Sequence, residues 1–140
     1  MNLAKVSWIF GSSVLLILGL MHLYLTFFTD EFYPKNSSLK SIMETNSPNL
    51  TDRLTFWSGW QGFNASHSIG VIFIGLINLY LISHYFKILA LDHSFFVINI
   101  LTVSVYIFLA SKYWFNVPLF GLMLTLLCFI TSYVLTITNQ

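Results

Sequence analysis

Charged residues are scarce in this chain. Of its 140 residues only 8% are Asp, Glu, Lys or Arg, and the net charge is +1. The sequence therefore has no basic patch and no charged tail, so we expect no nucleic-acid partner. A single cysteine, Cys128, excludes an intramolecular disulfide and a cysteine-cluster metal site. What remains is strongly apolar, because 56% of the residues are hydrophobic and the mean hydropathy is +0.77.

The few charges leave four long uncharged stretches. They cover residues 6–29, 54–86, 93–111 and 113–140. Crossing the ~30 Å hydrocarbon core takes ~20 apolar residues, and a backbone in lipid must satisfy its own hydrogen bonds. No alternation typical of barrel strands is present, so the stretches predict helices. We expect an all-α fold, a four-helix up-down transmembrane bundle, in one integral membrane domain over residues 1–140. The predicted spans are residues 6–28, 57–85, 94–111 and 117–138.

The first connection, residues 29–56, is too long to be structureless in a compact protein. Ser37 and Ser38 are suitable caps for a short amphipathic helix over residues 38–44. The apolar residues that share one face of this helix are Leu39, Ile42 and Met43. Residues 47–52 offer a second helix start that runs into the next span. We therefore expect a short amphipathic lid on the membrane surface between the first two spans.

The lysines and arginine indicate how the chain lies in the membrane. Four spans place both termini on one side, which carries Lys5 and Lys87. The opposite, lid side carries Lys35, Lys40, Arg53 and Lys112. Positive loops favour the cytoplasm, so we expect a cytoplasmic lid in a cell membrane. The first span is about 23 residues long and no small-residue cleavage site follows it, so we expect it to be retained rather than removed as a signal peptide.

The most polar part of any span is the stretch SGWQGFNASHSIG, residues 58–70. On a helix, residues three, four and seven apart share a face. One such line consists of Trp57, Gln61, Asn64 and Ser68, and His67 borders it. Two interpretations remain open. The stretch is either a ligand site or a tight helix–helix seam, in which Gly59, Gly62, Ser66 and Gly70 allow close approach.

Two histidines favour the first interpretation. His22 lies six residues before the end of the first span, at roughly 9 Å depth, and His67 lies roughly 15 Å into the second. Because these spans are antiparallel, both imidazoles lie in one leaflet. Ionisable groups within a bilayer are rare and are commonly functional. The predicted ligand-binding residues are His22, Gln61, Asn64, His67 and Ser68.

The other spans carry weaker polar lines. Thr125, Cys128, Ser132 and Thr136 follow one another at helical spacing, and Asn99, Val103 and Tyr106 line up on the third span. Hydroxyls in such helices commonly bond a backbone carbonyl one turn back. No carboxylate lies within a span, and no nucleotide-binding, zinc-protease or hydrolase motif is present.

Three elements together resemble a known family. They are a histidine late in the first span, the run W-x-G-F-N-x-S-H-S-x-G from Trp60 to Gly70, and Y-W-F-x-x-P from Tyr113 to Pro118. In these the chain is similar to an uncharacterised bacterial family of small four-helix integral membrane proteins. The resemblance covers nearly the whole chain and implies the fold and a bacterial inner-membrane location. It implies no activity, cofactor or partner.

Three classes of function remain open. The first is a pocket under the lid that binds a ligand or cofactor, and its most specific version is a haem held by His22 and His67. Two histidines are too few for a structural zinc site, so none is expected. The second is a small transporter or a membrane-embedded enzyme that acts on an apolar substrate. The third is a structural subunit that binds a membrane partner or a second copy of itself. No catalytic residue is predicted.

Overall fold

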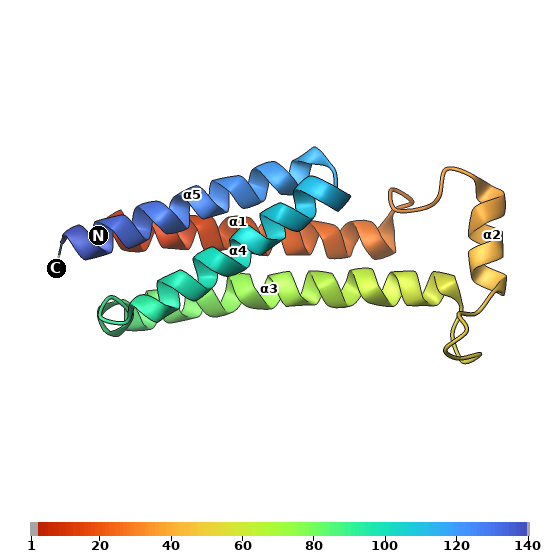
Figure 1. The fold of residues 1–140 in the computed structure, drawn as a ribbon, viewed down its shortest axis with the longest axis horizontal. Helices are drawn as coiled ribbons and strands as arrows, with labels where there is room; N and C mark the ends of the chain where they lie inside the picture. The colour runs from red at the N-terminus through yellow and green to blue at the C-terminus, as the bar shows by residue number, and fades with distance from the viewer. Residues whose placement is uncertain (1–2, 140) are drawn as a thin grey trace. The chain divides into compact units, whose positions relative to one another are not determined.

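A computed structural model describes residues 3–139, which form helices and no strand (Figure 1). The helices are α1 (Leu3–Phe28), α2 (Ser37–Thr45), α3 (Phe56–Leu89), α4 (His93–Tyr113) and α5 (Asn116–Thr138). All except α2 are long and apolar enough to cross a membrane. The predicted all-α fold with four spans is confirmed, and the chain is a small multi-pass membrane protein.

The helix ends differ little from the predicted spans, apart from the end of α3. That helix continues past the predicted end at Tyr85 to Leu89, but Tyr85 itself has non-helical angles, φ −120° and ψ 17°. The predicted boundary is therefore a kink rather than an end. Pro118 lies in the first turn of α5, where the missing N–H breaks no helical hydrogen bond.

The chain divides into two compact units. Unit 1 takes Met1–Leu18 and Val71–Gln140, and unit 2 takes Gly19–Gly70. Each unit receives one segment of α1 and one of α3, so two continuous helix backbones join them. The single-domain expectation for residues 1–140 stays a prediction.

Trp8 of α1 lies at the centre of unit 1 and is fully buried. Its ring stacks on Phe129 of α5 with centroids 3.9 Å apart and meets the edge of Phe96 of α4 at 4.9 Å. Its indole Nε1–H donates to Asn78 Oδ1 of α3 over 2.9 Å. One side chain thus contacts all three of the other long helices, which accounts for how α1 is packed in this unit.

Asn78 extends the contact with Trp8 into a buried network of hydrogen bonds. Its Nδ2 group donates to Asn99 Oδ1 of α4 over 2.7 Å and to the carbonyl of Ile74 over 3.0 Å. Asn99 in turn donates to the carbonyl of Phe95. The asparagine amides are satisfied by protein groups, as lipid-embedded polar groups must be. The sequence pattern places Asn99 on a polar line but gives no sign of Asn78, which lies among apolar neighbours.

The predicted polar line on α5 forms a seam with α1. Ser132 Oγ donates to the carbonyl of Ala4 over 2.7 Å, and Thr125 Oγ1 donates to the carbonyl of Gly11 over 3.3 Å. In the other direction, Ser7 Oγ donates to the carbonyl of Cys128 over 2.8 Å. Because these hydroxyls bond backbone carbonyls, the line is helix packing and not a ligand site.

Close approach between α1 and α3 occurs at Gly75. A Cβ built there would lie 2.9 Å from the backbone nitrogen of Leu16. At Gly62 and Gly70 such an atom would meet nothing within 4 Å. The predicted tight seam is therefore wrong for Gly62 and Gly70. The glycine that permits the close contact is Gly75, which ends the segment VIFIG directly after the polar stretch. Its apolar neighbours give no sign of this role in the sequence.

The lid helix α2 belongs to unit 2 and confirms the predicted short helix. Its cap is Asn36, whose side chain accepts from the backbone N–H of Ser38, rather than Ser37 or Ser38. The second predicted start is wrong, since residues 46–55 form turns and α3 begins at Phe56. A reciprocal pair of hydrogen bonds explains why α3 begins at Phe56. The side chains of Thr55 and Ser58 each accept a hydrogen bond from the other residue's backbone N–H.

Lys40 connects α2 to the rest of unit 2. Its ammonium lies 4.2 Å from the ring centroid of Tyr33 and 5.2 Å from that of Trp57, and Tyr33 meets Trp57 edge to face at 4.9 Å. Leu39 and Ile42 are exposed, whereas Met43 is half-buried. The ammonium on the aromatic pair, together with the bond from the Phe56 N–H to the Asn46 carbonyl over 2.9 Å, therefore positions the lid.

Replacing Lys40 with methionine is expected to loosen the lid, because the aliphatic stem stays while the cation–π contact and the 3.4 Å ion pair with Glu44 are lost. Such a contact contributes about 0.5–1 kcal/mol at exposed sites, so amide exchange over α2 should accelerate about two- to fivefold. Hydrogen exchange with mass spectrometry measures this. Lys35→Met is the matched control, since Lys35 is exposed. Equal acceleration in both variants would contradict the role of Lys40.

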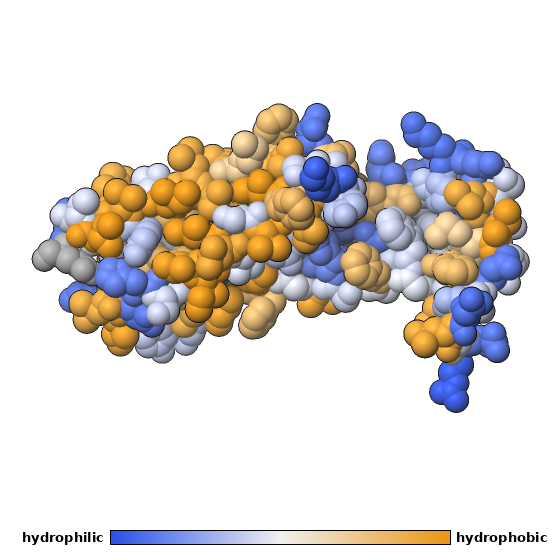
Figure 2. Space-filling model, in the orientation of Figure 1, coloured by the Kyte–Doolittle hydropathy of each residue, from blue (hydrophilic) through white to orange (hydrophobic). Residues whose placement is uncertain are grey.

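The surface of unit 1 matches a lipid environment. Apolar residues dominate the visible face of its helices in Figure 2. Examples from this unit that are more than half exposed are Phe73, Leu101, Phe108, Phe120 and Leu127. Water would disfavour so much exposed apolar surface, whereas the bilayer accepts it.

Candidate functional site

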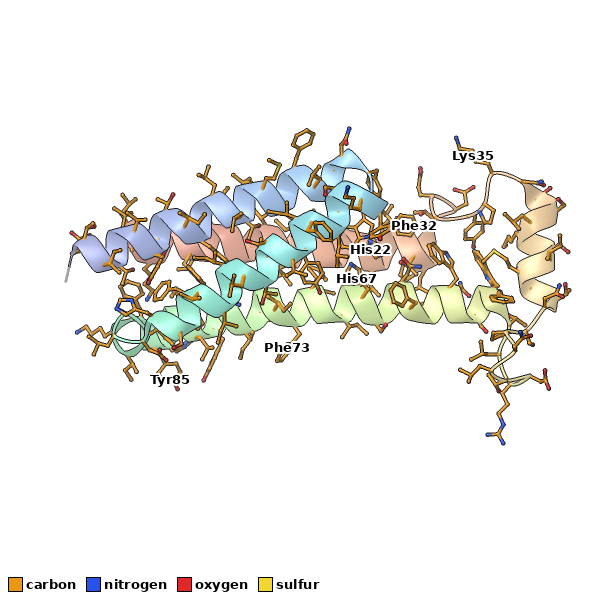
Figure 3. The ribbon with its side chains drawn as sticks, in the orientation of Figure 1. His22, Phe32, Lys35, His67, Phe73 and Tyr85 are labelled. Carbon is orange, nitrogen blue, oxygen red and sulfur yellow. The ribbon has the colours of Figure 1, made fainter. Side chains whose placement is uncertain are left out.

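The polar cluster predicted from the sequence lies within unit 2. His22 comes from the late part of α1, and Asn64 and His67 come from the early part of α3. Figure 3 shows the His22 and His67 side chains pointing toward one another from these two helices. Their ring centroids are 5.3 Å apart with planes at 71°, an edge-to-face contact. The predicted proximity of the two histidines is confirmed.

Asn64 fixes the hydrogen-bonding state of His22. Asn64 Nδ2 donates to the carbonyl of Trp60 over 2.9 Å, which orients the amide and turns its Oδ1 toward His22. His22 Nε2 lies 3.0 Å from that Oδ1. An amide oxygen only accepts, so Nε2 must carry the hydrogen, and a neutral His22 ring then has its lone pair on Nδ1. The cluster thus presents one defined acceptor nitrogen.

Buried residues surround this arrangement. Asn64 is only 7% exposed, and its own carbonyl accepts the hydroxyl of fully buried Ser68 over 2.8 Å. The carbonyl of His22 accepts the hydroxyl of buried Thr26 over 2.8 Å. These bonds lie within each helix, one turn away, so they satisfy the two hydroxyls without involving the side chains of His22 and Asn64.

Aromatic rings border the two imidazoles. Phe32, in the loop after α1, lies 4.8 Å from the His22 ring centroid, and Phe63 is parallel to His67 at 6.5 Å. Both histidines are half-buried. The His22 ring is therefore in contact with His67 and with Phe32. Sequence reasoning missed Phe32, because a loop residue has no helical spacing that would place it.

The other two predicted site residues have different roles. Ser68 uses its hydroxyl on the Asn64 carbonyl and is buried, so it supports the helix beneath the cluster. Gln61 lies one turn before Asn64 and is half-buried. No contact between its side chain and the imidazoles is recorded among residues 3–139. Of the five predicted residues, His22, Asn64 and His67 are brought together.

A metal or haem would need more than the cluster provides. Within residues 3–139 no group of three or more His, Cys, Asp or Glu side chains lies together as a metal site requires. A haem held by both imidazoles would place its porphyrin plane between them, and rings in edge contact leave no space for it. Haem at His22 and His67 stays a prediction that requires these two side chains to separate.

Comparison with other proteins adds nothing to this geometry, since no protein-family model, no curated protein and no solved structure matches the chain.

Proposed function

We propose that this membrane protein binds a lipid-soluble ligand that carries a hydroxyl group, at the cluster formed by His22, Asn64 and His67. The observation that supports the proposal is the hydrogen bond from His22 Nε2 to Asn64 Oδ1, because it leaves Nδ1 as an acceptor. A hydroxyl of the ligand donates to that nitrogen. A hydrogen bond between a neutral donor and a neutral acceptor contributes about 0.5–1.5 kcal/mol, which favours a ligand that carries a donor at this position.

The neighbouring rings favour an aromatic or flat ligand. Phe32 and Phe63 present apolar surface next to the two imidazoles, and aromatic pairs prefer tilted or offset contact of the kind seen here. Phenols and quinols combine a flat ring with a hydroxyl donor, so we take them as the ligand class. No carboxylate lies in the four long helices, and we propose binding without a chemical step.

A matched pair of probes tests the proposal. 4-Octylphenol has the hydroxyl, whereas 4-octylanisole replaces its hydrogen with a methyl group. Nitrogen NMR of the protein labelled at histidine in detergent micelles reports both the tautomer and the ligand. We expect free His22 to show a protonated Nε2, and we expect the Nδ1 resonance of His22 to shift with 4-octylphenol and not with 4-octylanisole. A protonated Nδ1 in the free protein would contradict the assignment.

His22→Gln is expected to weaken 4-octylphenol binding about three- to tenfold, the effect of one neutral hydrogen bond. A glutamine amide can still donate to Asn64 Oδ1, so the helix pair is kept while the acceptor nitrogen is lost. Isothermal titration in micelles measures the affinity. His84→Gln is the control, because His84 lies in unit 1 with its ring on Tyr80.

Equal affinity of the wild-type protein for both probes would contradict the proposal and favour a packing role for the cluster. In that case His22→Ala and His67→Ala should each lower the melting temperature, and the double variant should lose less than the sum, because the rings are in contact. Co-purification of a second copy or another membrane protein that His67→Ala disrupts would favour a partner-binding subunit.

We further propose a bacterial inner-membrane location with a cytoplasmic lid, on the basis of the family resemblance and the lysine distribution. Four lysine or arginine side chains on the lid side against two on the other favour this orientation. Reporter fusions at each terminus test it. Both reporters are expected outside the cytoplasm, and a cytoplasmic reporter at either end would overturn the orientation.

A further inference from the structure

The kink in α3 lies beside the first turns of α1, within unit 1. Tyr85, labelled in Figure 3, has the non-helical angles, and the carbonyl of Ser83 just before it accepts a hydrogen bond from Lys5 Nζ over 2.8 Å. Kinks at positions without proline have identifiable causes, and an inserted side chain is one of them. Here an ammonium from another helix bonds a carbonyl two residues before the kink.

An open cavity of about 610 Å³ lies at this kink. It is lined by Lys5 and by the run from Ser83 to Ile88, which includes His84 and Lys87. Two ammonium groups and an imidazole border it, and no carboxylate is among its lining residues. The cavity therefore has a positive charge that protein groups in its lining do not neutralise, which favours an anionic occupant.

The position of Lys5 adds to this preference. It stands in the first turn of α1, where the helix dipole already contributes positive partial charge, and a cation is unfavourable there. An anion at the cavity would be attracted by Lys5 and Lys87, whereas the positive dipole end of α1 is opposed by the C-terminal end of α3, which lines the same cavity. His84 contributes less, because its Nδ1 is within 2.9 Å of the carbonyl of Tyr80 and its exposed ring lies against that tyrosine.

The location identifies the source of the anion. The cavity lies at the ends of two helices that are long and apolar enough to cross a membrane, and Tyr80 and Tyr85 beside it are 51% and 43% exposed. Tyrosines of this kind mark the membrane–water interface, where lysines extend toward the lipid phosphates. We propose that the kink cavity, through Lys5 and Lys87, binds the phosphate of an anionic lipid headgroup.

Native mass spectrometry of the full chain in micelles tests this inference. Dioleoyl-phosphatidylglycerol is the probe, and dioleoyl-phosphatidylcholine is the zwitterionic reference. We expect preferential binding of the anionic lipid. Lys87→Gln should weaken it about fivefold, the factor that corresponds to about 1 kcal/mol for one lysine near the membrane surface. Lys87→Gln leaves the bond from Lys5 to Ser83 in place, so it changes the charge without removing the contact at the kink.

Lys112→Gln is the matched control, because Lys112 ends another membrane helix and does not line the cavity. An equal loss in this control, or equal binding of the two lipids by the wild-type chain, would overturn the proposal. Inorganic phosphate distinguishes the source of the anion. Displacement of the lipid by millimolar phosphate would assign the cavity to a soluble anion and overturn the lipid assignment, whereas retention of the lipid supports it.

Discussion

Gly75→Ala is expected to lower the free energy of unfolding by about 2–3 kcal/mol, although alanine is the better helix former by about 1 kcal/mol. The added Cβ would lie 2.9 Å from the backbone nitrogen and 3.0 Å from the Cα of Leu16. Backbone atoms cannot rotate away as a side chain can, so α1 and α3 must separate within unit 1. That separation also disturbs nearby packing, which makes the effect large for a single methyl group.

Unfolding in mixed micelles, followed by circular dichroism, measures the effect of Gly75→Ala. Gly62→Ala and Gly70→Ala are matched controls on the same helix, since their added atoms meet nothing within 4 Å. These controls should leave stability unchanged or raise it by up to about 1 kcal/mol through helix propensity. If Gly75→Ala behaves like them, the close contact between α1 and α3 in unit 1 is not present.

Asn78→Leu is expected to destabilise unit 1 by about 2–4 kcal/mol. The substitution leaves the Trp8 indole N–H without its acceptor and Asn99 Oδ1 without its donor, and orphaned buried polar groups each cost about 1–3 kcal/mol. The same unfolding experiment measures the loss, and near-ultraviolet circular dichroism should report altered packing of the Trp8 ring. Hydrogen bonds between membrane helices average only ~0.6 kcal/mol, so a larger loss points to the orphaned groups.

A control variant and a double-mutant cycle separate the cost of the orphaned groups from the general effect of losing a polar side chain. Thr102→Leu removes a hydroxyl that bonds only the Ile98 carbonyl of its own helix, so it should change stability by less than about 0.5 kcal/mol. Combining Asn78→Leu with Trp8→Phe removes both partners of one bond, and the double variant should lose less than the sum of the single variants. Strict additivity would mean that the indole and the amide are not coupled.

The sequence predicted those parts of the fold that depend on the solvent. Uncharged stretches identify helices that cross lipid because a charge there is expensive, and this holds whatever the helices pack against. Helix rise placed His22 and His67 at similar depth, and antiparallel order brought the two rings together. These inferences need only helical geometry and the membrane.

The parts that depend on partners could not be predicted. Asn78 and Gly75 are isolated among apolar residues, and their roles arise from Trp8 and Leu16, which lie far away in the sequence. The sequence pattern therefore favours a seam at the glycines of the polar stretch, which are more numerous. The kink at Tyr85 has no proline or glycine to signal it. The hydrogen bond to the nearby Ser83 carbonyl comes from Lys5, which is distant in the sequence.

The seam between α1 and α5 has a consequence for synthesis of the chain. The bond from Ser132 to the Ala4 carbonyl joins residues 128 positions apart. Ribosomes add about 5–20 residues per second, so α1 exists for several seconds or more before α5 has been made. During that interval the Ala4 and Gly11 carbonyls keep their hydrogen bonds within α1 but lack the second donors that Ser132 and Thr125 supply, and the Trp8 ring lacks its stacking contact with Phe129. The later-made helix α5 therefore completes the environment of the earlier-made helix α1.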